Sequence, residues 1–247
     1  MRWTLRVPTA ELEPALVRVL DAFPDGFSEE ADGDTVVISG YLPAGQTPAI
    51  DATPEDVAPG WREAWRAFHR PVTVGPFWLG PPWIAPDPGR EAIVIEPALA
   101  FGTGAHGSTR AALELLVRDP APRGALLDIG CGSGVLAIAA ARLGHAPVTA
   151  FDHDAHAVAA TRENAAVNGA AVDVWLGDAL TGEVPDAPLQ LANLQLELLV
   201  PLFARGATGR RVIASGLLER EVFAPAGYRW RDRETADGWQ ALLLERE

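Results

Sequence analysis

Three glycines occupy alternate positions in the stretch Asp128-Ile129-Gly130-Cys131-Gly132-Ser133-Gly134, which follows an apolar run. Glycine has no Cβ, so the backbone of such a loop can approach a bound ligand closely. An acidic residue, Asp152, ends the next apolar run of the chain. An acid at that point can accept hydrogen bonds from both hydroxyls of a ribose. Together the two features predict a nucleotide-type site built from a strand, a helix and a second strand.

The glycine spacing is G-x-G-x-G, whereas dinucleotide-binding enzymes typically carry G-x-G-x-x-G. The dinucleotide pattern serves a pyrophosphate, which S-adenosylmethionine does not have. The pattern therefore favours S-adenosylmethionine over NAD. A tight strand-to-helix turn without a ligand is the alternative explanation of the glycines alone, and the placement of Asp152 argues against it.

Two further polar positions follow later strands. Open α/β sheets bind ligands at the carboxyl ends of their strands, so these positions should converge with the glycine loop. We expect Asp178, after Gly177, to contact the adenine amino group, and Asn193, before Leu194, to lie next to the reacting methyl group. Alternatively, Asp178 begins a turn and Asn193 caps the following helix.

Alternating strands and helices must position these residues. Apolar runs predict strands at Ala125–Ile129, Pro147–Asp152, Val172–Leu176, Leu189–Asn193 and Arg211–Ser215. Helical spacing predicts helices at Ser108–Val117, Val135–Leu143, Ala155–Asn168 and Leu196–Ala204, with Asp154 capping the third and Gly169 ending it. This alternation predicts an α/β fold with a doubly wound, mainly parallel sheet. Residues 228–235 and 239–245 predict a closing hairpin, with an antiparallel strand at the sheet edge.

The amino-terminal part has a different pattern. Residues 3–7 alternate as in a half-buried strand, Thr9 can cap a following helix, and residues 36–38 predict another strand. Residues 43–60 contain four prolines and predict a linker. Aromatic residues at helical spacing then predict a short packing helix over residues 61–68. We therefore expect an amino-terminal domain over residues 1–55, a linker helix over 56–72 and a nucleotide-type domain over 73–247.

Composition restricts the class of protein. The net charge is −13, and residues 1–60 hold eleven Asp or Glu against three Arg, a net charge of −8. This acidity disfavours nucleic acid and favours a basic partner, although a merely solvated surface is the alternative. We expect no membrane span and no signal peptide, and the single Cys131 excludes an internal disulfide framework. The expected location is the cytoplasm. The histidines show no metal-ligand spacing, so no metal is expected.

A second glycine-rich segment, Ile95-Glu96-Pro97-Ala98-Leu99-Ala100-Phe101-Gly102-Thr103-Gly104-Ala105-His106-Gly107-Ser108-Thr109-Arg110, precedes the first predicted helix. Such a loop can cover a cofactor. The segment resembles the I-E-P-x-x-A-F-G-T-G-x-H-x-x-T-R signature of the PrmA family, the methyltransferases of ribosomal protein L11. The glycine loop resembles the D-x-G-x-G-S-G-V-L of that family, and residues 215–218 resemble its S-G-I-L. Asn193-Leu194 stands where the family has an Asn-Ile or Asn-Leu pair.

The resemblance implies a function and a site. It implies transfer of methyl groups from S-adenosylmethionine to the amino terminus and lysines of a basic ribosomal protein, by a monomer with a ferredoxin-like amino-terminal recognition domain. Our own hypothesis for the mechanism makes Asn193 the catalytic residue, which holds a neutral amine toward the methyl group. The cofactor contacts that we expect, by resemblance and by position, are Thr109, Gly130, Asp152, Asn193, Phe101, Gly102, Asp128, Gly132 and Asp178.

The chain departs from the family near the expected amine pocket. Ala105 and Gly107 stand where the family has a histidine and a glutamate, and Gln195 replaces a bulky apolar residue. A methyltransferase for another protein or a small amine is therefore a rival function. A nucleotide-dependent oxidoreductase and a non-enzymatic ribosome-associated binding module are two further rivals. His106 is expected to structure the loop, with a proton relay as the alternative.

Overall fold

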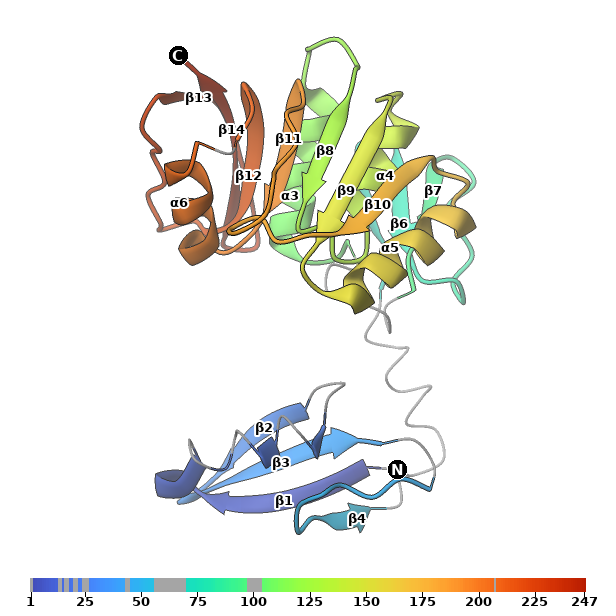
Figure 1. The fold of residues 1–247 in the computed structure, drawn as a ribbon. Coiled ribbons are helices and arrows are strands. Elements are labelled where there is room, and N and C mark those ends of the chain that lie inside the picture. The colour runs from blue at the N-terminus through green and yellow to red at the C-terminus, as the bar shows by residue number, and fades with distance from the viewer. Residues whose placement is uncertain are drawn as a thin grey trace. The chain divides into compact units, whose positions relative to one another are not determined.

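The computed structural model describes residues 2–12, 15, 18–19, 22–23, 27–42, 45–55, 70–96, 104–206 and 208–247. The chain divides into two compact units, residues 1–68 and 69–247 (Figure 1). The linker helix predicted over residues 56–72 lies outside the described residues except for its last three. Of these, Val72 begins a strand, so the predicted helix is wrong at this end.

The first unit is a four-stranded antiparallel sheet with the strand order β2-β3-β1-β4. Its strands are β1 (Arg2–Pro8), β2 (Phe27–Asp32), β3 (Thr35–Tyr41) and β4 (Thr53–Glu55). A 3-10 turn over Thr9–Glu11 follows β1, and Pro8, not Thr9, is its N-cap residue. Strand β4 falls inside the segment predicted as a linker, and that prediction is wrong there. A three-residue edge strand with a central proline carries almost no pattern in the sequence.

The predicted ferredoxin-like fold of this unit has partial support. All three strand pairings are antiparallel, and the central strands β1 and β3 pair along their whole length. Within the part of this unit that the structure describes, no helix lies between β3 and β4, since residues 42 and 45–52 are irregular. The ferredoxin-like fold therefore stays a prediction.

The second unit is built on a seven-stranded sheet with the order β10-β9-β8-β11-β12-β14-β13 (Figure 1). The strands are β8 (Leu126–Ile129), β9 (Val148–Asp152), β10 (Val172–Leu176), β11 (Leu189–Asn193), β12 (Arg211–Leu218), β13 (Tyr228–Ala236) and β14 (Trp239–Arg246). Strands β8 to β12 pair in parallel. The predicted mainly parallel α/β sheet is confirmed, and each predicted strand of it is present within a few residues.

The predicted position of the antiparallel strand is wrong. Strand β14 lies inside the sheet, between β12 and β13, and β13 forms the edge. The pattern of burial explains the order, because residues 240–244 of β14 are buried on both faces of the sheet. Strand β13 is mostly exposed and carries alternating arginines, as edge strands commonly do.

Helices cover both faces of this sheet. Helices α3 (Gly107–Arg118), α4 (Val135–Arg142) and α5 (Ala155–Val167) contribute to one apolar core, and α6 (Leu196–Ala204) contributes to the core on the other face. All four predicted helices are confirmed. Asp154 caps α5 by accepting a hydrogen bond from the His156 amide at 2.8 Å, and Gly169 follows the helix with a φ of 58°, both as predicted.

A small sheet, formed by residues that precede α3 in the chain, was not predicted. Strands β5 (Val72–Val74), β6 (Phe77–Gly80) and β7 (Glu91–Val94) form it in that order. The strands are three or four residues long and a proline-rich loop interrupts them, so the sequence lacks the periodicity that identifies longer strands. Strand β6 is buried along its length and joins the core beside α3.

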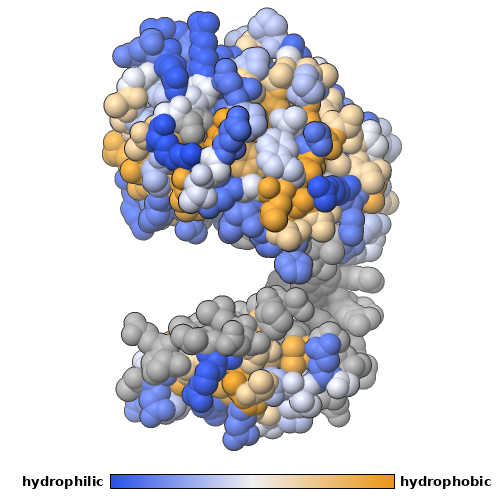
Figure 2. All heavy atoms as spheres, viewed as in Figure 1, coloured by the Kyte–Doolittle hydropathy of each residue, from blue (hydrophilic) through white to orange (hydrophobic). Residues whose placement is uncertain are grey.

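The surface shows intermixed polar and apolar residues. Figure 2 shows apolar side chains scattered among polar ones over the face of the second unit in view. Across the described ranges, no helix is long and apolar enough to cross a membrane.

Candidate functional site

The glycine loop connects the central strand β8 to helix α4. Its amides at Gly130 and Cys131 both donate to the carbonyl oxygen of Phe151, at 2.9 and 3.1 Å, so the loop is attached to the end of β9. The three glycines have φ values of 74°, 53° and 80°, in the left-handed region. Gly134 is the N-cap of α4, and a Cβ there would lie 2.6 Å from Thr161 Cγ2. The predicted need for glycine is thus conformational as well as steric.

Asp152 lies at the carboxyl end of β9, against this loop. One carboxylate oxygen accepts a hydrogen bond from the Gly132 amide and the other from the Asp154 amide, both at 3.0 Å. The residue is 8% exposed. Each oxygen of a carboxylate has a second lone pair, so the group can also accept bonds from a ligand. The structure thus brings together two of the predicted residues, Gly132 and Asp152.

Asp128 is placed differently from the other predicted residues. It is 1% exposed, and its carboxyl accepts a hydrogen bond at 3.2 Å from the Ala137 amide in the first turn of α4. Burial, followed by the nearby charge of Asp152, raises the pKa of Asp128 to about 7. Asp128 therefore supports the helix that begins at the loop, and its predicted contact with a cofactor stays a prediction.

A cavity of about 210 Å³ opens beside the glycine loop at the carboxyl ends of β8 to β11. Its walls are mainly apolar and include two acidic residues. The lining residues are Gly130, Phe151, Asp152, His153, Gly177, Asp178, Ala179, Leu180, Leu194 and Leu198. The cavity thus includes three predicted residues, Gly130, Asp152 and Asp178. The apolar lining by Phe151, Leu180 and Leu198 was not predicted, although Phe151 immediately precedes the predicted acid.

Asp178 begins a turn, which is the alternative to a cofactor contact that the sequence left open for it. Its two carboxylate oxygens accept hydrogen bonds from the Leu180 amide and the Thr181 hydroxyl, both at 2.7 Å. The Leu180 bond is the main reason that the pKa of Asp178 lies below its usual value. The residue is exposed and lines the cavity. A contact with an adenine amino group stays a prediction.

Asn193 ends strand β11 and contacts helix α3. Its side-chain Nδ2 donates to the hydroxyl of Thr109, at 3.2 Å, and Thr109 is 1% exposed. Leu194, the next residue, lines the cavity, and a Cβ on Gly130 would lie 2.6 Å from its Cδ2. Because the amide nitrogen is engaged by Thr109, the side-chain oxygen of Asn193 can accept a bond from another donor. The structure thus joins two further predicted residues, Thr109 and Asn193.

His106 is the N-cap of helix α3. Its Nδ1 lies 2.8 Å from the Ser108 hydroxyl, and its ring lies 4.6 Å from the ring of Trp239. Burial, then the neighbouring Arg110 guanidinium, lowers the pKa of His106. A neutral imidazole can accept a hydrogen bond from the first turn of the helix. These contacts support the predicted structuring role.

Two predicted contacts cannot be placed. Phe101 and Gly102 lie outside the described residues.

Cys131 is buried in the glycine loop, and its thiol accepts a hydrogen bond from Thr161 at 3.2 Å. In the described part of the chain, no cluster of three or more His, Cys, Asp or Glu side chains could hold a metal ion.

The fold and the site together define a class. A seven-stranded mixed sheet of this order carries the glycine loop after its central strand and the acid after the neighbouring strand. This arrangement is consistent with a class I methyltransferase fold. The crystal structure of ribosomal protein L11 methylase from Lactobacillus delbrueckii subsp. bulgaricus is similar, with a TM-score of 0.65 and 27% identity, and the match covers 72% of this chain and 100% of that chain.

The sequence comparison identifies the family. The profile of the family described as ribosomal protein L11 methyltransferase (PrmA) matches residues 34–247, and the chain belongs to that family. The ribosomal protein L11 methyltransferase of Pelobacter propionicus is 34% identical, over 96% of this chain and 85% of that protein. The protein of that name from Symbiobacterium thermophilum is 36% identical, over 74% of this chain. The match covers 64%, 66% and 60% of the lengths of three curated relatives.

Proposed function

We propose that the chain is a protein N-methyltransferase that transfers methyl groups from S-adenosylmethionine to amino groups of ribosomal protein L11, at its amino terminus and lysines. One observation carries this proposal: in a chain of this family, Asn193, which bonds Thr109, directly precedes Leu194 in the lining of a cavity that Asp152 also lines. An amide that is already held by a buried hydroxyl can position an incoming amine, and an acid beside a glycine loop can bind a ribose.

The residues of the cavity fit S-adenosylmethionine. Asp152 would accept bonds from the ribose hydroxyls, and the apolar side chains of Phe151 and Leu198 would contact the faces of the adenine. Phe151 stacks on Trp175 of β10, with ring centroids 5.3 Å apart, so a second aromatic ring packs behind this wall of the cavity. The glycines bring the loop backbone close to the remaining part of the ligand. When bound, the cofactor supplies an electrophilic methyl group on a sulfonium.

The chain must present a neutral amine to that methyl group. A lysine amine has a pKa near 10.4, so its deprotonation at about pH 7.4 costs roughly 4 kcal/mol. A nearby positive charge and exclusion of water both lower the pKa of the amine. We propose that the Asn193 side-chain oxygen accepts a hydrogen bond from the amine and orients its lone pair. Thr109 fixes that orientation, because it holds the Asn193 nitrogen. Positioning then supplies most of the acceleration.

We propose that the first unit recognises the substrate protein, through a ferredoxin-like fold. Exposed acids support this role, since a ribosomal protein is basic: Glu11, Glu30, Asp32, Asp34, Asp51 and Glu55. Two of the acids are already paired, Asp32 with Arg6 and Glu55 with Arg2. The others remain available to cations of a partner. A cytoplasmic monomer that acts on L11 completes the proposal.

Intact mass spectrometry tests the proposal. The purified chain is incubated with S-adenosylmethionine and the large-subunit ribosomal proteins of its own organism. Gain of about 14 Da steps on L11 alone, the mass of a methylene, supports the proposal. Methylation of a different protein or of a small amine supports the rival methyltransferase, which the departures at Ala105, Gly107 and Gln195 favour. Cofactor binding without any methyl transfer supports the binding module.

A further inference from the structure

The first turn of helix α3 contacts the tight turn that joins β13 and β14. A Cβ on Gly107 would lie 2.3 Å from the carbonyl oxygen of Ala236 and 2.9 Å from Trp239 Cδ1. The His106 ring lies on Trp239, and the Arg110 guanidinium forms an ion pair with Asp237. Three positions at the start of the helix, 106, 107 and 110, therefore touch three positions of the hairpin, 236, 237 and 239.

The β13–β14 turn is well fixed. Asp237 and Gly238 have φ values of 50° and 78°, as in the two-residue turns that suit a hairpin. Ala236 pairs directly with Trp239. The Gly238 carbonyl accepts a hydrogen bond from the Glu219 amide at 2.8 Å, which attaches the turn to the end of β12. The carbonyl that faces Gly107 belongs to a backbone that cannot easily shift.

The first turn of α3 also carries Thr109, which with Asn193 makes up the proposed reaction centre. Thr109 is two residues after Gly107 and accepts the hydrogen bond from Asn193. The Arg110 amide donates to the His106 carbonyl at 3.1 Å, so these residues form one hydrogen-bonded helical turn. A displacement of Gly107 would therefore move Thr109 and, through it, the Asn193 side chain.

We propose that the β13–β14 turn positions the reaction centre, and that Gly107 is the positioning residue through which it acts. The inference rests on the proposed function for its role in catalysis. The turn lies outside the cavity lining. The close approach also explains a departure from the family: a glutamate at position 107 would collide with the Ala236 carbonyl.

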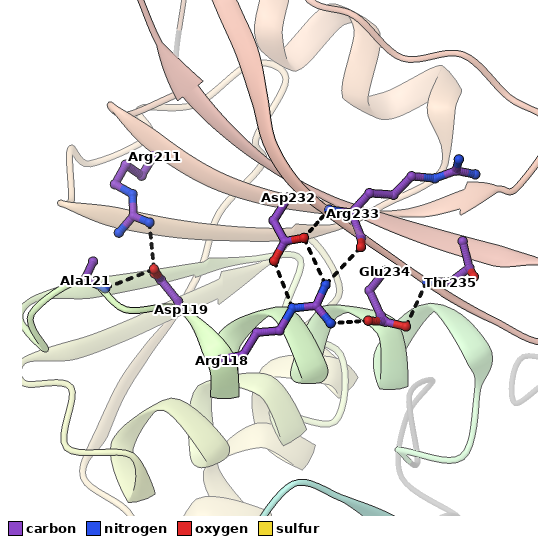
Figure 3. Close-up of polar contacts among 8 residues, drawn as sticks. All are labelled: Arg118, Asp119, Ala121, Arg211, Asp232, Arg233, Glu234 and Thr235. Atoms are coloured by element: carbon purple, nitrogen blue, oxygen red, sulfur yellow. Dashed lines mark hydrogen bonds and ion pairs between the residues drawn. The ribbon is translucent and has the colours of Figure 1, made fainter.

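The far end of α3 offers a control. Figure 3 shows Arg118, in the last turn of the helix, between Asp232 and Glu234 of β13. Arg118 Nε and Nη2 donate to the two carboxylate oxygens of Asp232, at 2.8 and 3.1 Å, and Arg118 also pairs with Glu234. These contacts hold the same helix to the same strand, but about two and a half turns away from Thr109. Their loss weakens the interface without moving the first turn.

The test compares two glycine variants and two interface variants in the full chain. Gly107→Ala adds a methyl against the Ala236 carbonyl, whereas Gly124→Ala adds one into open space. Trp239→Leu removes the ring under His106, whereas Arg118→Gln breaks the distant ion pairs. We expect Gly107→Ala and Trp239→Leu to lower kcat for methyl transfer about 10-fold or more, since small misplacements are costly. The KM for S-adenosylmethionine should change much less, and the controls should keep the wild-type kcat.

A second measurement does not depend on activity. The NMR signals of the Asn193 side-chain amide in the free protein should shift in Gly107→Ala and Trp239→Leu, and stay unchanged in both controls. If Gly107→Ala fails to fold, Trp239→Leu alone carries the test. Wild-type signals and kcat in both test variants would overturn the inference. Absence of methyl transfer by the wild-type chain, with the expected amide shifts, would overturn the proposed function alone.

Discussion

Among the described residues, the Asn193 side chain makes one hydrogen bond, through its nitrogen, which leaves its oxygen for an amine, so its removal tests the chemistry directly. Asn193→Ala should lower kcat on the order of 100-fold, because orientation of the nucleophile is lost. Affinity for S-adenosylhomocysteine, measured by calorimetry, should fall only moderately, because Asp152 and the glycine loop remain. Glu197→Ala is the control, since Glu197 is exposed in the first turn of α6 and does not line the cavity. Near wild-type turnover in Asn193→Ala would contradict the proposed role.

Asp128 gives the protein a pH-dependent stability. Its folded-state pKa of about 7 exceeds the unfolded value near 3.9, so the folded chain binds more protons between those values. The free energy of unfolding contributed by this group therefore falls as pH rises from about 4 to about 7. Asp128→Asn keeps an acceptor for the Ala137 amide but carries no charge. The variant should lose this pH dependence and gain stability above pH 7, as measured by urea unfolding.

An exposed acid serves as the control for that experiment. Asp173→Asn changes the same functional group on the surface of β10 and should leave the pH dependence of unfolding unchanged. Equal pH profiles for wild type and Asp128→Asn would show that the buried carboxyl does not carry the effect.

At the scale of elements, helix α5 and its C-cap Asn168 connect the glycine loop to the end of β7. Buried Asn164 donates to the Ser133 carbonyl of the glycine loop at 2.9 Å and accepts from the Glu96 amide at 3.2 Å. Asn168, one turn later, bonds both the amide and the carbonyl of Val94. The helix thus fixes the glycine loop and the exit of β7, which leads into the segment that resembles the family signature.

Loss of the Asn164 hydrogen bonds should lower the free energy of unfolding. Asn164→Ala removes the hydrogen bonds to the buried Ser133 carbonyl and from the part-buried Glu96 amide, at about 1–3 kcal/mol for each bond lost. Urea unfolding should therefore show a loss of roughly 2–4 kcal/mol, and hydrogen exchange should become faster near residues 94–96. The neighbouring exposed position supplies the control, because Glu163→Ala removes no buried contact. A loss no larger than that of Glu163→Ala would contradict the structural role of Asn164.

At the scale of the whole molecule, the uneven charge predicts how a basic substrate is bound. Raising salt from about 0.1 M to about 1 M shortens the Debye length from about 10 Å to about 3 Å. The KM for L11 should rise over that range, because the acids of the first unit are screened, whereas the KM for S-adenosylmethionine should change little. Steady-state kinetics at several salt concentrations measures both constants.

Neutralising the acids of one unit at a time tests which unit causes the salt dependence of the KM for L11. Amide replacement of three exposed acids of the first unit, Glu11, Glu30 and Asp34, should reduce the salt dependence of the L11 KM. The same replacement of three exposed acids of the second unit, Glu163, Asp173 and Glu183, should leave it unchanged. An equal reduction by both sets would show that only the total charge matters.

The sequence predicted those parts of the fold in which local pattern and tertiary environment agree. Strands β8 to β11 are apolar runs that end in glycine, acid or amide, and each was identified within a residue or two. Strand β2 carries Glu29, Glu30 and Asp32, which have low strand propensity, and it forms because β3 pairs with it. The position of β14 inside the sheet depends on long-range pairing with β12, which a local pattern cannot specify.

For the candidate site, the sequence predicts which residues lie there better than it predicts the contacts that they make. Asp152 and Asn193 could be identified because they end strands of a parallel sheet. The hydrogen bond from the first turn of α4 to Asp128 could not, because a carboxyl near the end of a strand looks the same in sequence whether it faces a ligand or a helix end. The hydrogen bond between Thr109 and Asn193 joins residues that are 84 positions apart, and no local pattern links them.

The reactivity of the Cys131 thiol can measure how often the glycine loop opens. Burial raises its pKa to about 12, and the side chain is 7% exposed, so the folded chain presents almost no reactive thiolate. Alkylation of this single cysteine must therefore wait until the loop opens. The labelling rate of the unmodified protein measures the frequency of that opening, and the slowing of labelling by a bound ligand measures how far the ligand closes the loop.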